Sequence, residues 1–132
     1  MFADMGEGTA AELDAMVARA RPVVAQSLRD GSYRGWLVER GGMVIAGGGV
    51  AILTYQPGPA DIDTRRAWVL NVYTEPSVRE QGLARLVMTT IVAWCREQGL
   101  RTVSLHASRD GRHLYESLGF RPTNEMRLPI PT

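Results

Sequence analysis

Between residues 67 and 107 the sequence reads as a strand, a glycine-containing loop, a long amphipathic helix and a second strand. Residues 67–74 are almost continuously apolar, which predicts a strand buried on both faces, and Pro76 ends its pairing. Residues 83–98 carry an apolar stripe at helical spacing, and residues 102–107 alternate apolar and polar side chains. Strands joined by a helical crossover run parallel. The chain is therefore constrained to a sheet with at least one parallel pair.

The rest of the chain predicts antiparallel strands and further helices. We expect a helix at residues 10–29, a hairpin of strands at 36–39 and 43–55, a solvated loop at 56–66, a short helix at 111–118 and a last strand at 120–128. Three glycines at 47–49 favour a bulge in the second strand. With 132 residues, 45% of them hydrophobic, one domain spanning residues 1–132 is expected. The predicted fold class is α+β, with a mixed, mostly antiparallel central sheet flanked by helices.

The loop before the long helix has the sequence Arg79-Glu80-Gln81-Gly82-Leu83-Ala84. The first N–H groups of a helix have no acceptor within the helix, and their partial positive charge suits a phosphate. Gly82 has no Cβ, so an anion can approach the backbone there. The loop lacks the Lys-Ser/Thr end of a Walker loop and the third glycine of a dinucleotide fingerprint. A glycine that only eases a strand-to-helix turn is the alternative for so short a pattern.

A second motif follows after one helix and one strand, with the sequence Leu114-Tyr115-Glu116-Ser117-Leu118-Gly119-Phe120. In this order the two segments resemble the GNAT N-acetyltransferase family, most clearly over residues 67–128. The resemblance implies an acyl-CoA N-acyltransferase fold, acetyl-CoA as co-substrate without a metal, and acetyl transfer to a primary amine of a small molecule or peptide by direct attack. A catalytically degenerate acetyl-CoA-binding sensor or partner module is the alternative.

The resemblance also implies which residues form the site. The pantetheine arm would contact Val72, Tyr73 and Thr74 in the strand before the loop. The pyrophosphate would be held by Arg79, Glu80, Gln81, Gly82, Leu83, Ala84 and Arg85, largely through their backbone. Ser108 stands where the family often has an asparagine, and it would bond the coenzyme or cap the short helix. Tyr115 matches the tyrosine beside the coenzyme sulfur and would protonate the departing thiolate, the alternative being an aromatic that packs between helix and sheet.

The general base is not assigned by the resemblance. Many GNAT enzymes carry a glutamate early in the strand before the loop, whereas residues 67–70 contain no carboxylate. The sequence offers three candidates, which are Asn71 acting through a water, Glu75 and His106. His106 is included because histidine side chains ordinarily titrate near neutral pH. A strand amide, a turn acid and an ordinary histidine are the respective alternatives.

The start of the chain departs from the family pattern. A typical GNAT domain opens with a strand and a helix, whereas the first clear element here resembles the second helix. The resemblance therefore implies a domain that lacks the usual first strand and most of the first helix, with residues 1–8 as a remnant of that helix. The sheet edge left exposed predicts a homodimer, or else a start codon assigned too late.

Composition excludes several other classes. The formal charge is +1 and no basic block with interleaved aromatics occurs, so a nucleic-acid partner is not expected. Without a signal peptide or about eighteen consecutive apolar residues, we expect a cytoplasmic protein that does not bind membranes. The single cysteine, Cys95, is predicted to pack in a helix and not to act as a nucleophile. Attraction of a cationic amine is one interpretation of Asp61 and Asp63, and a solvated loop is the simpler one.

Overall fold

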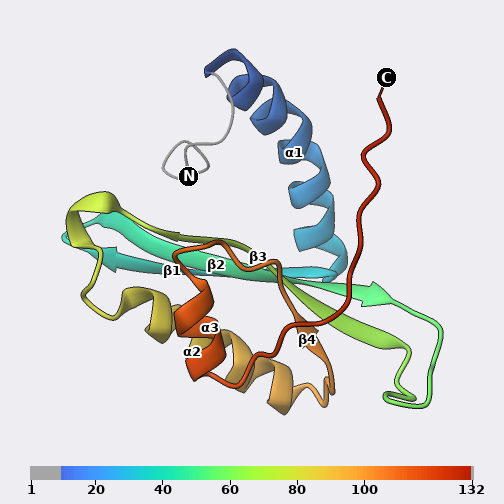
Figure 1. Cartoon of the computed structure of the whole chain (residues 1–132). Helices are drawn as coiled ribbons and strands as arrows, with labels where there is room; N and C mark the ends of the chain where they lie inside the picture. The colour runs from blue at the N-terminus through green and yellow to red at the C-terminus, as the bar shows by residue number, and fades with distance from the viewer. Residues whose placement is uncertain (1–9, 132) are drawn as a thin grey trace.

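The computed structural model describes residues 10–131, which form a four-stranded sheet with helices on both sides (Figure 1). In chain order the elements are α1 (Ala10–Asp30), β1 (Tyr33–Arg40), β2 (Met43–Thr54), β3 (Arg65–Thr74), a 3-10 turn (Pro76–Val78), α2 (Leu83–Glu97), β4 (Val103–Ser104) and α3 (Arg112–Ser117). The remnant helix expected at residues 1–8 lies outside the described residues.

The strand order is β1-β2-β3-β4. The pairs β1–β2 and β2–β3 are antiparallel, and β3–β4 is parallel, as the crossover through α2 requires. Gly41 and Gly42 turn the β1–β2 hairpin with φ of 58° and 80°, the left-handed values of a two-residue hairpin turn. These observations confirm the predicted α+β class and its mixed, mostly antiparallel sheet.

The core lies between the sheet and α2. The apolar stripe of α2 buries Val87, Met88, Ile91 and Cys95 against Ala46, Val50, Ala67 and Val69 of the strands. Each large aliphatic side chain buried in this way contributes roughly 1.5–3 kcal/mol. At the β1 edge the core is closed by the rings of Trp36 and Trp94, whose centroids are 5.6 Å apart in an edge-to-face arrangement.

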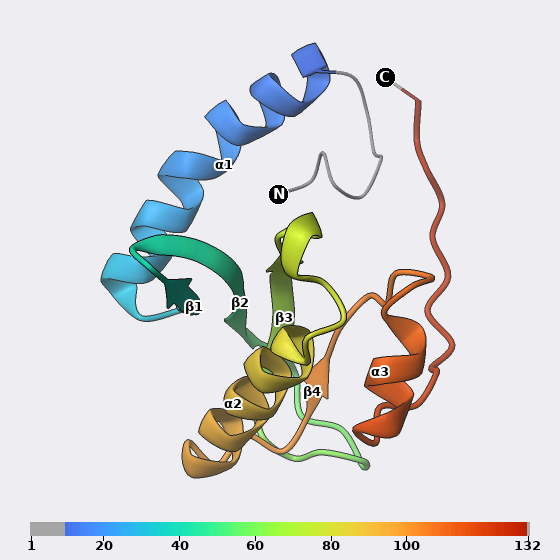
Figure 2. The same ribbon diagram turned by 90° about the vertical axis from the view of Figure 1, so that its left-hand side faces the viewer.

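The opposite face of the sheet is only partly covered. Figure 2 shows α1 over β1, away from β3 and β4. In β3 only Ala67 and Val69 are buried, and Leu70 is 45% exposed. The prediction that this strand is buried on both faces is therefore wrong, because one helix covers the α2 side and no described element covers the other side of β3.

A register shift occurs at the glycine triplet, as predicted, but the extra residue lies in β3 and not in β2, because two steps of β2 from Gly47 to Gly49 lie opposite three steps of β3 from Tyr73 to Leu70. The β2–β3 register shifts between Gly47 and Gly49, opposite Asn71, whose φ is 60°. A Cβ on Gly49 would lie 2.0 Å from the Tyr33 hydroxyl, so the tyrosine occupies the space that a side chain would need. Asn71 Nδ2 donates a hydrogen bond to that hydroxyl at 3.0 Å. The bulge thus brings residues of β1, β2 and β3 together on the open face.

Two predicted strands differ from the structure. The expected strand at 102–107 is reduced to Val103–Ser104, and the expected strand at Phe120–Leu128 is wrong, because residues 120–131 form no strand. Pro122 has no N–H to donate to a ladder. Met126 and Leu128, which an edge strand would need to bury, are 95% and 82% exposed. The C-terminal segment instead runs past the end of the sheet toward the side of α1 (Figure 1).

The 56–66 loop is tied to the sheet by Asp61, which is buried. The Thr102 hydroxyl and the Asp63 backbone N–H donate hydrogen bonds to its carboxylate, and Arg66 forms an ion pair with it at 3.4 Å. Asp63 pairs with Arg65 at 3.0 Å. Both acids therefore have structural partners, and they precede β3 at the end where it is paired with β4.

Candidate functional site

The strands β3 and β4 separate shortly after they meet. Their ladder consists of Ala67 opposite Val103 and Trp68 opposite Ser104. β3 then continues to Thr74, so Val72, Tyr73 and Thr74 lie beyond the last pair. β4 therefore does not run beside this part of β3.

The C-terminal end of β3 leads, after the 3-10 turn Pro76–Val78, into a loop with two left-handed residues. Glu80 and Gly82 have φ of 69° and 77°, and α2 begins at Leu83. The first helical bond runs from the Leu86 N–H to the Gly82 carbonyl at 3.0 Å. The preceding N–H groups belong to the open first turn of α2, where an anion is favoured. A Cβ on Gly82 would meet nothing within 4 Å, so the space above it is open.

Three arginines surround this loop. Arg79 Nε donates to the Thr74 carbonyl at 3.3 Å and Arg85 Nη2 to Ser117 Oγ of α3 at 2.8 Å. Arg40, at the end of β1, donates to Gln81 Oε1 at 3.2 Å. Arg40 was not anticipated from the sequence, because it lies 41 residues from its partner and no local pattern marks it. The three guanidinium groups add to the positive potential of the helix start.

Tyr115 lies on α3 and is 9% exposed. Its ring packs edge-to-face on Phe120 at 6.0 Å and against Gly111. The hydroxyl makes no hydrogen bond with the described part of the chain, yet no described side-chain oxygen is both fully buried and unpaired. It therefore reaches open space. Burial raises the pKa of Tyr115, so the phenol holds its proton at neutral pH.

Ser108 stabilises the start of α3. Its Oγ accepts a hydrogen bond from the Gly111 N–H at 3.1 Å, and its carbonyl accepts one from the Arg112 N–H at 3.0 Å. Ser108 therefore holds the turn that precedes α3, whose N-cap residue is Gly111.

Comparison with known proteins identifies this arrangement. The sequence matches the Acetyltransferase (GNAT) family over residues 6–120. The chain belongs to the GNAT acetyltransferase family. Its fold is similar to that of a GCN5-related N-acetyltransferase from Ralstonia eutropha JMP134, with 37% identity, a TM-score of 0.91, and coverage of 98% of this chain and 85% of that one. Comparison with curated proteins found no match.

Other GNAT structures are similar at greater distance. A predicted acetyltransferase from Clostridium acetobutylicum, crystallised with acetyl-CoA, has 25% identity and a TM-score of 0.86 over 98% of this chain and 82% of that one. A ribosomal-protein-alanine N-acetyltransferase from Brucella melitensis biovar Abortus 2308 shares the fold, with 20% identity and a TM-score of 0.64 over 80% and 74% of the two chains. The fold and the family identify an N-acetyltransferase.

The three candidates for the GNAT general base have different surroundings. Asn71 is bonded to Tyr33 across the bulge. Glu75 accepts a hydrogen bond from the Tyr73 hydroxyl just beyond the end of β3. His106 Nε2 lies 2.5 Å from Glu125 Oε2, a carboxylate of the C-terminal segment that the sequence pattern did not mark. Because residues 119–131 have no regular structure, no periodic signal predicts that pair.

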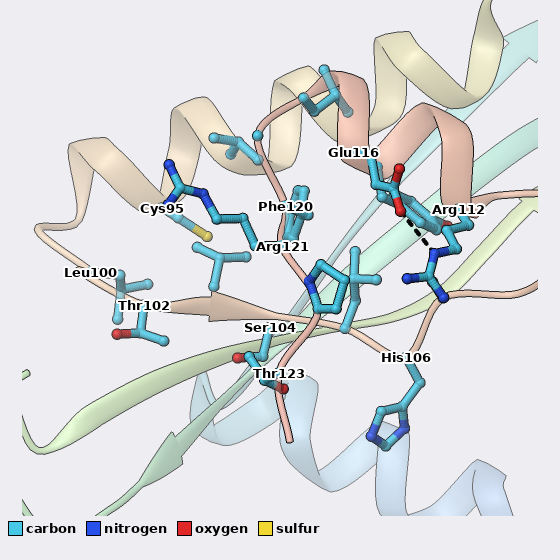
Figure 3. A pocket seen from close by; sticks show the side chains of 18 of the residues that line it. Cys95, Leu100, Thr102, Ser104, His106, Arg112, Glu116, Phe120, Arg121 and Thr123 are labelled. Atoms are coloured by element: carbon cyan, nitrogen blue, oxygen red, sulfur yellow. Dashed lines mark hydrogen bonds and ion pairs between the residues drawn. The ribbon is translucent and has the colours of Figure 1, made fainter. Parts of the chain in front are cut away.

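A cavity of about 770 Å³ lies between the second half of α2, β4, α3 and residues 118–125 (Figure 3). Cys95, Leu100 and Phe120 line its apolar part, and none of the described loop residues 79–85 reaches it. Cys95 is fully buried there, and burial raises the pKa of its thiol, which agrees with a packing role.

Among residues 10–131 no group of three His, Cys, Asp or Glu side chains is placed to bind a metal ion. None of the helices in that part of the chain has the length and apolar character needed to span a bilayer.

Proposed function

We propose that this GNAT protein transfers the acetyl group of acetyl-CoA to a primary amine of a small molecule or peptide, by direct attack of the amine on the thioester. One observation carries the proposal: β3 parts from β4 after Trp68, and the end of β3 leads through the 3-10 turn Pro76–Val78 into the left-handed loop at the start of α2. A pantetheine arm has amides that pair with a strand edge, and a pyrophosphate suits the helix start. The open space above Gly82 fits such a ligand.

The residues then have distinct roles. Val72, Tyr73 and Thr74 would pair with the pantetheine, and residues 79–85 together with Arg40 would bind the pyrophosphate. Tyr115 would give its proton to the departing sulfur, since its hydroxyl is protonated and has no partner in the described chain. Ser108 would act by holding the start of α3, the helix that carries Tyr115.

The acceptor would approach from the face of the sheet opposite α2. Along β3 the α2 face is covered by core side chains, whereas Leu70 on the other face is exposed. Acetyl-CoA is named with the Clostridium structure, and a ribosomal-protein alanine is the acceptor named for the Brucella enzyme. These relatives support an amine acceptor. Asp61 and Asp63 would not recognise it, because their carboxylates are engaged at the other end of β3.

Two measurements on the purified protein test the proposal. Acetyl-CoA at a hundred times its Kd should stabilise the fold by about 2.7 kcal/mol, measured by thermal unfolding. Release of free CoA thiol should follow when amines are supplied from a panel of alkylamines, aminoglycosides and peptides. Absence of the thermal shift would refute the coenzyme site. A shift without thiol release for every amine would refute the transferase and favour the alternative of a sensor or partner module.

A further inference from the structure

His106 lies at the mouth of the gap between β3 and β4. Trp68 and Ser104 form the last pair of the ladder, and His106 follows two residues later. The rings of Trp68 and His106 meet edge-to-face, with centroids 5.0 Å apart. The histidine is therefore held at the point where the two strands separate.

The face on which His106 lies follows from the register. A Cβ on Gly48 would touch Val87, so Gly48 faces α2 and Ala51, three residues on in the same strand, faces the other way. Trp68 pairs with Ala51 and shares its face. Figure 3 shows the His106 side chain directed away from α2 and α3. His106 thus lies on the open face, from which the acceptor amine would enter.

The imidazole has one engaged nitrogen and one available nitrogen. Nε2 is bonded to Glu125 Oε2 at 2.5 Å, and Arg127 bonds the other carboxylate oxygen at 3.3 Å. Nδ1 has no hydrogen-bond partner in the described chain, and the side chain is 56% exposed. A carboxylate on one nitrogen fixes the ring orientation and stabilises the imidazolium when the other nitrogen takes a proton.

We infer that His106 is the general base of the proposed acetyl transfer and that Glu125 is its positioning residue. Nδ1 takes a proton from the acceptor ammonium, which frees the nitrogen lone pair. The C–N bond forms as the C–S bond breaks, and the sulfur is protonated by Tyr115. The acetylated nitrogen then gives its excess proton to the Tyr115 oxygen, which restores the phenol. His106 releases its proton to solvent. This inference rests on the proposed function.

The other two candidates are less suited. An amide nitrogen has no basic lone pair, and Asn71 Nδ2 already donates to Tyr33. Glu75 lies beyond the end of β3, where the Tyr73 hydroxyl engages its carboxylate. His106 alone among the three combines an available nitrogen with a place beside the strand separation.

The chain's two histidines allow a matched experiment. His106→Gln keeps a donor for Glu125 but removes the base, so kcat/KM for the best amine should fall about 10²–10³-fold. His113→Gln, an exposed position on α3, is the control and should leave the rate unchanged. The acetyl-CoA thermal shift should be the same in both variants, because neither side chain touches the proposed coenzyme loop.

The pH profile separates a base from a structural contact. Wild-type kcat/KM should fall on the acid side as His106 is protonated, and this limb should vanish in His106→Gln. Glu125→Gln should keep the acid limb and lower kcat/KM less than His106→Gln does, because the imidazole is still present but is no longer held by a carboxylate. The stability of each variant is measured alongside.

Each outcome decides the inference. Wild-type turnover with an unchanged rate and acid limb in His106→Gln would overturn the base and leave the proposed function standing. A variant that loses only thermal stability would show that the pair merely ties down the C-terminal segment, which also overturns it. No wild-type turnover with any amine would remove both the function and the base.

Discussion

The ring and the hydroxyl of Tyr115 have different surroundings. The ring is fixed by Phe120 and by the close approach of Gly111, whereas the oxygen has no partner in the described chain. A tyrosine that only filled space would be expected to satisfy its hydroxyl locally. Burial raises its pKa, so the side chain is a proton donor over the whole physiological range.

Tyr115→Phe should therefore impair transfer without disturbing the fold. Removing one oxygen leaves the packing intact, and loss of a positioned acid costs typically 10²–10⁴-fold, so we expect kcat to fall at least about 10²-fold. Thiol release under saturating substrate measures this, with the acetyl-CoA thermal shift as the control for binding. Equal kcat in the variant and the wild type would exclude Tyr115 as the acid.

At the scale of elements, the junction of β3 with α2 depends on Gly82. Its φ of 77° is one that residues with a Cβ avoid. Gly31, which follows α1, also has a left-handed backbone, with φ of 80°. A Cβ on either glycine would meet nothing within 4 Å. The two positions therefore share the same backbone cost, and only one of them lies at the proposed pyrophosphate site.

Gly82→Glu and Gly31→Glu make a matched pair. Each should lower the thermal stability of the free protein by roughly 1–2 kcal/mol, the cost of a left-handed residue. Only Gly82→Glu places a carboxylate beside the pyrophosphate, so it should abolish the stabilisation by acetyl-CoA that Gly31→Glu retains. Isothermal calorimetry gives the two affinities directly. Wild-type affinity in Gly82→Glu would show that the coenzyme binds elsewhere.

The loop before β3 is fastened by a charged carboxylate. Hydrogen bonds from Thr102 and the Asp63 N–H, with Arg66 nearby, lower the pKa of Asp61. A lowered pKa means that the unfolded chain takes up the proton first as the pH falls. The stabilisation is thus present above the ordinary aspartate pKa of about 3.9 and is lost at lower pH.

Asp61→Asn should therefore unfold at a lower temperature than the wild type near pH 7, and the difference should shrink toward about pH 3. Asp110→Asn, at an exposed position before α3, is the control and should match the wild type throughout. Thermal melts across this pH range provide the measurement. A difference that does not depend on pH would mean that the carboxylate's charge is not what holds the loop.

At the scale of the whole molecule, prediction succeeded where the signal is periodic or local. The stripe of α2, the turn at Gly41 and the register shift at Gly47–Gly49 each follow from nearby residues, although the extra residue at that shift lies in β3 and not in β2. The burial of β3 could not be predicted in this way, because apolar composition does not show that α1 lies over β1 and leaves one face of β3 uncovered. The His106–Glu125 contact joins residues 19 apart through an irregular segment, and only three-dimensional coordinates reveal it. The family motifs located the loop, but not Arg40.

The edge of the sheet at β1 determines how whole molecules can associate. β1 pairs with β2 on one side and with no described residue on the other, and its Leu37 is 68% exposed. An open edge strand is a template for pairing with another chain. We therefore expect a homodimer at micromolar concentration, with a mass in light scattering of about twice 14.5 kDa.

Leu37→Glu should yield monomers because charges on an edge strand oppose pairing, whereas Ile62→Glu, equally exposed in the distant 56–66 loop, should not. A wild-type protein that elutes as a monomer would contradict this prediction.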